Sequence, residues 1–162
     1  MRAKGSVTVK GRTYTFDDSK DYGILDWGRG VWTYSNTWYW ASLNSELNGK
    51  PFGFNLGYGF GDTTAASENM LFYDGKCHKL DLIDFCIPEN VMDTWNMTSS
   101  DNRFNMRFTP FFNDRTDISV GIMSQHADKL FGMLNGVAIL DDGTELKIEN
   151  MPVFHERVQN KW

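Results

Sequence analysis

The sequence predicts an all-β protein whose antiparallel strands form a meander that closes into a barrel or folds into a strongly curved sandwich. Turn dipeptides recur along the chain, large apolar residues alternate with small or polar ones between them, and no segment of about ten residues has a helical period. A meander this long must curl, because an open twisted sheet leaves edges that invite aggregation. A barrel of about eight strands is just wide enough to hold one small ligand.

Turn dipeptides separate the expected strands in chain order. Lys10-Gly11, Asn48-Gly49, Asp74-Gly75 and Asp142-Gly143 each lie between β-rich runs, and the chain turns again near Asp101-Asn102. Asn-Gly and Asp-Gly supply the positive φ values that two-residue type I′ turns require. We therefore expect antiparallel hairpins at these positions.

Residues 51–61, PFGFNLGYGFG, alternate with a period of two. The even positions are large and apolar, whereas the odd positions from 53 on are glycine or asparagine, so the two sets occupy opposite faces of a strand. A glycine face predicts close approach by another part of the chain or by a ligand. In DISVGIMSQ, residues 117–125, the same period predicts one strand with Ile118, Val120 and Ile122 on a shared face.

Composition narrows the class of protein. A chain of 162 residues is expected to form a single domain. The net charge of −5 and the lack of a basic run argue against a nucleic-acid partner. No apolar stretch is long enough for a membrane span and the N-terminus has no signal-peptide core, so we expect a cytoplasmic location. In that compartment Cys77 and Cys86 are expected to be reduced, buried thiols.

Residues 22–43 gather four tryptophans and three tyrosines around one aspartate and one arginine. If a continuous strand begins at Trp32, then Trp32, Tyr34, Trp38 and Trp40 project to one face. Two interpretations stay open, because these rings either fill a barrel core or form the wall of a ligand cavity. Indole and phenol groups need hydrogen-bond partners when they are buried. Leu and Val have no such requirement, so they fill a hydrophobic core at a lower free-energy cost.

Asp26 and Glu68 are the candidate catalytic residues. Asp26 is either an acid whose pKa is raised by desolvation in an aromatic cavity, or a turn carboxylate paired with Arg29. Glu68 belongs to a polar cluster that is otherwise an ordinary loop. The candidate ligand-binding residues are Trp27, Arg29, Trp32, Trp38, Trp40, Asn55 and Asn69.

Spacing predicts that these residues meet. Strands of a meander usually pair in sequence order, so Asp26, Trp27, Trp38 and Trp40 are expected to converge on one concave site with Glu68 or Asn69 near its rim. The three histidines are far apart and no metal-binding motif is present, so no metal site is expected. GYGFGD lacks the context of a nucleotide-binding loop, and no cofactor is expected.

Three stretches resemble the domain-of-unknown-function family 2804 of mostly bacterial proteins. They are LDWGRGVWTYSNTWYWAS, GKPFGFNLGYGFGD and ASENMLFYDGKCHKL, and the later pieces FTPFF and AILDDGTELKI also fit. Members are usually longer, and this chain resembles the C-terminal half. The resemblance implies that residues 1–162 are one β domain whose partner is an N-terminal β half. A second protomer is the alternative partner.

The chain is more distantly similar to the lipocalin-like superfamily of carotenoid hydratases, tocopherol cyclase and AttH-type proteins. Asp26-Trp27-Gly28 stands where these proteins have an Asp-His-x-Trp-Gly turn, and Trp38-Tyr39-Trp40 stands where they have a Trp-x-Trp strand; the histidine is missing here. The resemblance implies a lipocalin-like, or calycin-like, barrel that binds a small, largely apolar ligand.

Three functional hypotheses stay open, and the first of them rests on this resemblance. In the first, the protein is an enzyme of the hydratase, isomerase or cyclase type. Asp26 would then protonate the substrate, and the indoles of Trp27, Trp38 and Trp40 would stabilise the resulting cation. In the second, the protein is a non-catalytic carrier or sensor of the same ligand. In the third, it is a purely structural or interaction domain.

Overall fold

The computed structural model describes all 162 residues, and every regular element in it is a β-strand. The strands are β1 (Gly5–Val9), β2 (Arg12–Phe16), β3 (Ser35–Leu47), β4 (Lys50–Tyr58), β5 (Met70–Tyr73), β6 (Lys76–Lys79), β7 (Ile83–Asp84), β8 (Trp95–Ser99), β9 (Phe104–Val120), β10 (Met123–Ile139) and β11 (Glu145–Lys161). The predicted all-β fold is confirmed. The chain has no helix of the length and hydropathy that crossing a membrane requires.

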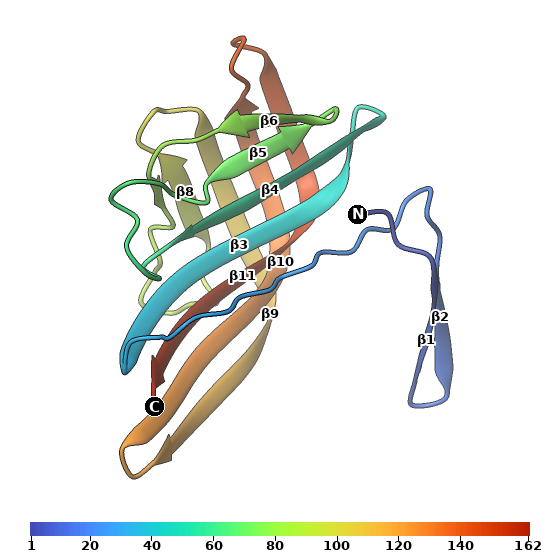
Figure 1. The fold of residues 1–162 in the computed structure, drawn as a ribbon. Helices are drawn as coiled ribbons and strands as arrows, with labels where there is room; N and C mark the ends of the chain where they lie inside the picture. Colours follow the sequence, from blue (N-terminus) through green and yellow to red (C-terminus); the bar gives the residue numbers. More distant parts are fainter.

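Nine of the strands form one antiparallel sheet in the order β6-β5-β4-β3-β11-β10-β9-β8-β7. The sheet curls strongly into a half-barrel, while β1 and β2 form a separate ribbon that stands away from it (Figure 1). The edge strands β6 and β7 are not hydrogen-bonded to each other, so the sheet stays open. Only the pairing of β3 with β11 departs from sequence order, and it places the last strand at the centre of the sheet.

Left-handed residues close the hairpins at the predicted dipeptides. Asn48 and Gly49 have φ values of 54° and 73° between β3 and β4, and Asp74 and Gly75 have values of 51° and 77° between β5 and β6. Between β10 and β11, Gly143 has a φ of 84°. Lys10, Gly11 and Asn102 also have positive φ values, between β1 and β2 and between β8 and β9. All five expected turns are confirmed, since each one joins antiparallel neighbours.

The sequence did not indicate the turn between β9 and β10. Gly121, with a φ of 59°, and Ile122 lie in this turn. The expectation of one strand carrying Ile118, Val120 and Ile122 is therefore wrong. A single glycine can reverse the chain when it adopts the left-handed conformation, but Gly-Ile has no further turn residue to mark the position.

The inner face of the curled sheet is filled with side chains. A core of 23 buried residues covers it, including Phe54, Leu56, Trp95 and Phe108. In β4 the even positions from Phe52 to Leu56 face this core, as the alternation predicted. The half-barrel therefore encloses a packed interior.

His155 of β11 lies in this core without a polar partner. Its ring is fully buried and stacks on the Phe108 ring, with the two centroids 3.9 Å apart and the planes 7° apart. Neither ring nitrogen has a hydrogen-bond partner. Desolvation by burial lowers the pKa of His155 to about 3, so the ring is neutral in the folded protein.

The cysteines only partly match the expectation. Cys77 and Cys86 are free thiols, but both are exposed, so the expected burial is wrong. Cys77 lies on the edge strand β6, where its neighbour His78 occupies the buried face. Cys86 follows the short strand β7 in the left-handed conformation, with a φ of 40°.

Candidate functional site

Residues 22–34 lie in an extended segment that crosses the outer face of β3 and β11 (Figure 1). We call this outer face, which carries Trp38 and Trp40 in β3, the Trp face. A hollow of about 440 Å³ lies between the segment and the Trp face. The residues that line it are Asp26, Trp27, Gly28, Trp32, Trp38, Tyr39, Trp40, Asn55, Phe60, Glu68, Glu156 and Trp162.

The hollow lies on the side of the sheet opposite the core. In β3, Ala41 and Leu43 are buried in the core, and Trp38 and Trp40 alternate with them, so they project to the other side. The sequence had led us to expect these rings inside a barrel, either as core or as the wall of an internal cavity. The interior is filled instead, and the rings form one wall of a hollow outside it.

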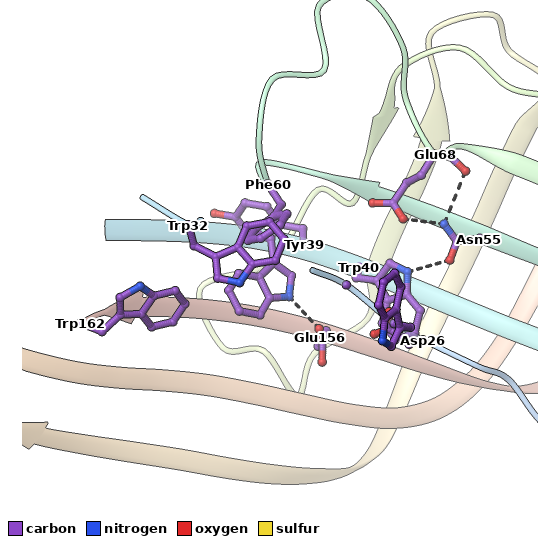
Figure 2. Close-up of a pocket in the computed structure, with 12 residues that line it drawn as sticks. Asp26, Trp32, Tyr39, Trp40, Asn55, Phe60, Glu68, Glu156 and Trp162 are labelled. Carbon is purple, nitrogen blue, oxygen red and sulfur yellow. Dashed lines mark hydrogen bonds between the residues drawn. The ribbon is translucent and has the colours of Figure 1, made fainter. Parts of the chain in front are cut away.

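Protein acceptors hold the indoles of Trp38 and Trp40 in place. Trp38 Nε1 donates to Glu156 Oε1 at 2.7 Å, and Trp40 Nε1 donates to Asn55 Oδ1 at 2.9 Å. The pairing of β3 with β11 supplies the first contact, and the pairing of β3 with β4 supplies the second. Figure 2 marks the hydrogen bonds that Glu156 and Asn55 accept with dashed lines. Each indole therefore has its polar atom satisfied while part of its ring remains accessible.

Asn55 connects Trp40 to Glu68. The Asn55 Nδ2 group donates to Glu68 Oε2 at 2.6 Å, which draws this loop carboxylate over β4 (Figure 2). Gly57 leaves the necessary space, because a Cβ atom there would collide with Glu68 Oε1 and would lie 3.1 Å from the Tyr39 carbonyl oxygen. The predicted glycine face thus accommodates a close approach, and at Gly57 the group that approaches is a carboxylate.

The segment opposite the sheet contributes Asp26, Trp27 and Trp32. Trp32 precedes β3, so the expected continuous strand from residue 32 is wrong, and the Trp32 ring packs instead on Phe60 with centroids 4.9 Å apart. Phe60 also contacts Trp38, at 5.4 Å between centroids. Phe60 therefore links the segment to the sheet.

Asp26 reaches the hollow without a protein partner. Its carboxylate forms no hydrogen bond and no ion pair, and it is not paired with Arg29. Arg29 is exposed and does not line the hollow. The unpaired, cavity-facing arrangement is the one in which a carboxylate is free to contact a ligand.

Asn69 supports the backbone beside the hollow. It is buried, its Oδ1 accepts from the Gly57 amide at 2.9 Å, and its Nδ2 donates to the Asp81 carbonyl at 3.1 Å. Both amide atoms are therefore occupied by the main chain, and Asn69 does not line the hollow. The structure brings seven of the nine candidate residues together and leaves out Arg29 and Asn69.

Sequence reasoning missed four side chains around the hollow: Tyr39, Phe60, Glu156 and Trp162. Glu156 lies directly opposite Trp40 in the register of β3 and β11. That register joins residues more than a hundred positions apart, so no local pattern could have indicated it. Trp162, the last residue, enters the site through the same pairing.

Comparison with known proteins identifies the family. Residues 1–162 match the family described as domain of unknown function, DUF2804. The chain belongs to this family. No curated protein matches the chain. No solved structure matches it either. Because the family description carries no activity, the function of this DUF2804 protein must be argued from the site itself.

A second hollow in this DUF2804 protein, of about 260 Å³, is lined mostly by polar side chains of β9, β10 and β11. Its buried Asp128 accepts hydrogen bonds from Arg157 at 2.7 Å and from Asn113 at 2.9 Å. Nearby, Asp117 accepts from His126 and from Arg115. The contacts of Asp128 with Arg157 and of Asp117 with His126 join neighbouring strands, whereas Arg115 and Asp117 lie on the same strand, β9. We assign this cluster to strand pairing.

Proposed function

We propose that this protein binds a small, largely apolar ligand in the hollow between residues 22–34 and the Trp face. The observation that carries the proposal is the distribution of tryptophan, since five of the six indoles line this one hollow. Ring surface left open to water favours an apolar ligand, because burial of each Å² stabilises the complex by about 25 cal/mol. The volume of about 440 Å³ falls within the range of small-molecule sites.

Polar groups at fixed positions would orient the ligand. Asn55, Glu68 and Glu156 are held by the hydrogen bonds described above, so their positions do not depend on a ligand. Small-molecule sites combine an apolar lining with a few such groups. A non-catalytic carrier or sensor needs only an apolar lining and a few such polar groups. Ligand binding without catalysis is therefore the primary proposal.

Calorimetric titration with phenylbutanol, a neutral and largely apolar probe, tests the proposal. We expect Trp40→Ala to weaken binding about tenfold, because it removes a ring wall and also frees Asn55. Phe72→Ala, which removes an exposed ring outside the hollow, serves as the matched control. Circular dichroism verifies that both variants fold. No binding to the wild-type protein, or equal losses in the two variants, would refute the proposal.

Acid catalysis of the hydratase, isomerase or cyclase type is a second candidate function, and the unpaired Asp26 carboxylate favours it. An acid that protonates an apolar substrate at neutral pH needs a pKa close to the working pH. Carbon-13 NMR of the Asp26 carboxyl, with the apolar probe bound, measures that pKa. A carboxyl that is fully ionised at neutral pH would exclude Asp26 as the general acid, while the binding proposal would stand.

A further inference from the structure

We infer that the ligand of this hollow carries a positive charge, as an ammonium or related organic cation attached to a largely apolar body. The inference rests on the proposed binding function and specifies its ligand class. The charges that line the hollow all have one sign. Asp26, Glu68 and Glu156 all contribute carboxylates, and the twelve lining residues include no lysine, arginine or histidine.

These three carboxylates are not neutralised elsewhere. The eight ion pairs of the chain involve other acidic residues, and none includes Asp26, Glu68 or Glu156. Glu68 and Glu156 receive hydrogen bonds from neutral donors only, an amide and an indole. Their negative charge therefore acts on whatever enters the hollow, and three like charges attract a cation more strongly than any one of them does.

Among the three carboxylates and the groups bonded to them, the hydrogen-bonding capacity left over consists of acceptors, whereas the free donors of the lining are the indoles of Trp27, Trp32 and Trp162 and the Tyr39 hydroxyl. The indole N–H groups of Trp38 and Trp40 already donate to Glu156 and Asn55. The Asn55 side-chain amide in turn donates to Glu68. Glu156 Oε2, Glu68 Oε1 and the Asp26 oxygens remain without a partner. Ionised carboxylates only accept hydrogen bonds, so the ligand that satisfies them must donate.

The aromatic rings favour the same chemistry. The negative face of an indole attracts cations, and aromatic cages bind alkylammonium groups in this way. The chain places its own cations over Tyr22, Tyr14, Tyr73 and Tyr34, all of which lie outside the lining of the hollow. The faces of the hollow's indoles are therefore free of protein cations.

The geometry argues against the two other charged classes of ligand. A metal ion would need acidic groups that converge on one point, and no three His, Cys, Asp or Glu side chains of the chain do so. An anionic ligand would meet three carboxylates and no positive partner. An organic cation, whose charge is spread over several atoms, can contact separated carboxylates and rings together.

Three probes that share one apolar body and differ in their head group test the inference. Phenylbutylamine is cationic at neutral pH, phenylbutanol is neutral and phenylbutyrate is anionic. In calorimetry at low salt we expect the amine to bind about tenfold more tightly than the alcohol, and the carboxylate to bind most weakly. Added salt should narrow the gap between amine and alcohol.

Variants assign that preference to the hollow. Glu68→Gln combined with Glu156→Gln keeps the acceptor atoms for Asn55 and Trp38 but removes two charges, so amine and alcohol should bind almost equally. Glu46→Gln combined with Glu145→Gln removes two exposed charges outside the hollow and should leave the preference intact.

The outcomes separate the two proposals. If the alcohol binds and the amine binds no more tightly, the ligand class is wrong and the binding function stands. If both double variants lose the preference equally, the effect is one of net charge and the inference is also wrong. If none of the three probes binds, both proposals are overturned.

Discussion

His155 shows how a single buried residue couples stability to pH. Its ring is fully buried, stacks on Phe108 and has no hydrogen-bond partner. The unfolded chain binds a proton near pH 6.5, whereas burial lowers the pKa of the folded state to about 3. Between these values the unfolded state binds more protons, so the free energy of unfolding must fall as the pH falls.

Replacing His155 with leucine should remove this dependence. As the pH is lowered from about 6 towards 3, we expect the wild-type protein to lose up to about 1.4 kcal/mol per pH unit more than His155→Leu. Urea unfolding at several pH values measures the difference, and groups that titrate in both proteins cancel. Parallel pH profiles would show that the histidine does not contribute.

Gly57 is the residue that allows Glu68 to lie over the sheet. We expect Gly57→Ala to destabilise the fold by about 1–2 kcal/mol, because the new methyl group displaces the Glu68 carboxylate. In a Glu68→Ala background the cost should fall to well under half, since the two nearest contacts, both with the Glu68 carboxylate, are removed while the Tyr39 carbonyl contact at 3.1 Å remains. A Cβ atom at Gly53 would lie 2.5 Å from the Leu43 carbonyl oxygen, so the cost of Gly53→Ala should be the same in either background. Equal costs for Gly57→Ala in the two backgrounds would contradict the account.

At the scale of elements, β3 uses both of its faces. Ala41 and Leu43 pack into the core while Trp38 and Trp40 line the hollow, so one strand couples the folded interior to the site. Turn chemistry and alternation predicted this strand, its hairpin partner β4 and the all-β class. The position of β11 beside β3 could not be predicted, because that pairing is non-local. Without it, neither Glu156 nor the outward location of the hollow follows from the sequence.

The β1–β2 ribbon is the least supported element. All residues of both strands are exposed, and the ribbon pairs with no other strand. Two-stranded ribbons without a packed face are marginally stable in water. By hydrogen exchange with NMR detection, we expect amides of Ser6–Thr15 to exchange about a hundredfold faster than those of β3 and β11 around Trp40 and Glu156. Comparable protection would show that the ribbon is held by contacts absent from this structure.

At the scale of the whole molecule, the chain exposes an unusually large surface. A compact monomer of 18.6 kDa is expected to expose roughly 8,200 Å², whereas this chain exposes 10268 Å². Part of the excess comes from the ribbon, and part comes from apolar side chains on β9 and β10. The latter are Phe112, Ile118, Val120, Met123 and Phe131, each 41–63% exposed.

We expect two copies of the chain to pair through this β9–β10 surface. A stable interface buries about 800 Å² on each partner, which is well below the excess of roughly 2,000 Å². Sedimentation velocity should show a dimer at micromolar concentration, and Phe112→Asp should shift it to monomer. Phe72→Asp, which adds a charge away from β9 and β10, is the control. A wild-type protein that stays monomeric at high concentration would contradict this expectation.

The central claim is that the hollow over the Trp face, and not the packed interior, is where a ligand binds. The indole region of the nitrogen-15 NMR spectrum tests it most directly, because the six tryptophans report on both places. Trp95 is fully buried in the core and donates to the Val91 carbonyl at 2.9 Å, so it provides an internal reference. On titration with phenylbutylamine, we expect saturable shifts for Trp38 and Trp40 and an unchanged Trp95 signal. Shifts centred on Trp95, or no shift at any indole at saturating probe, would contradict the central claim.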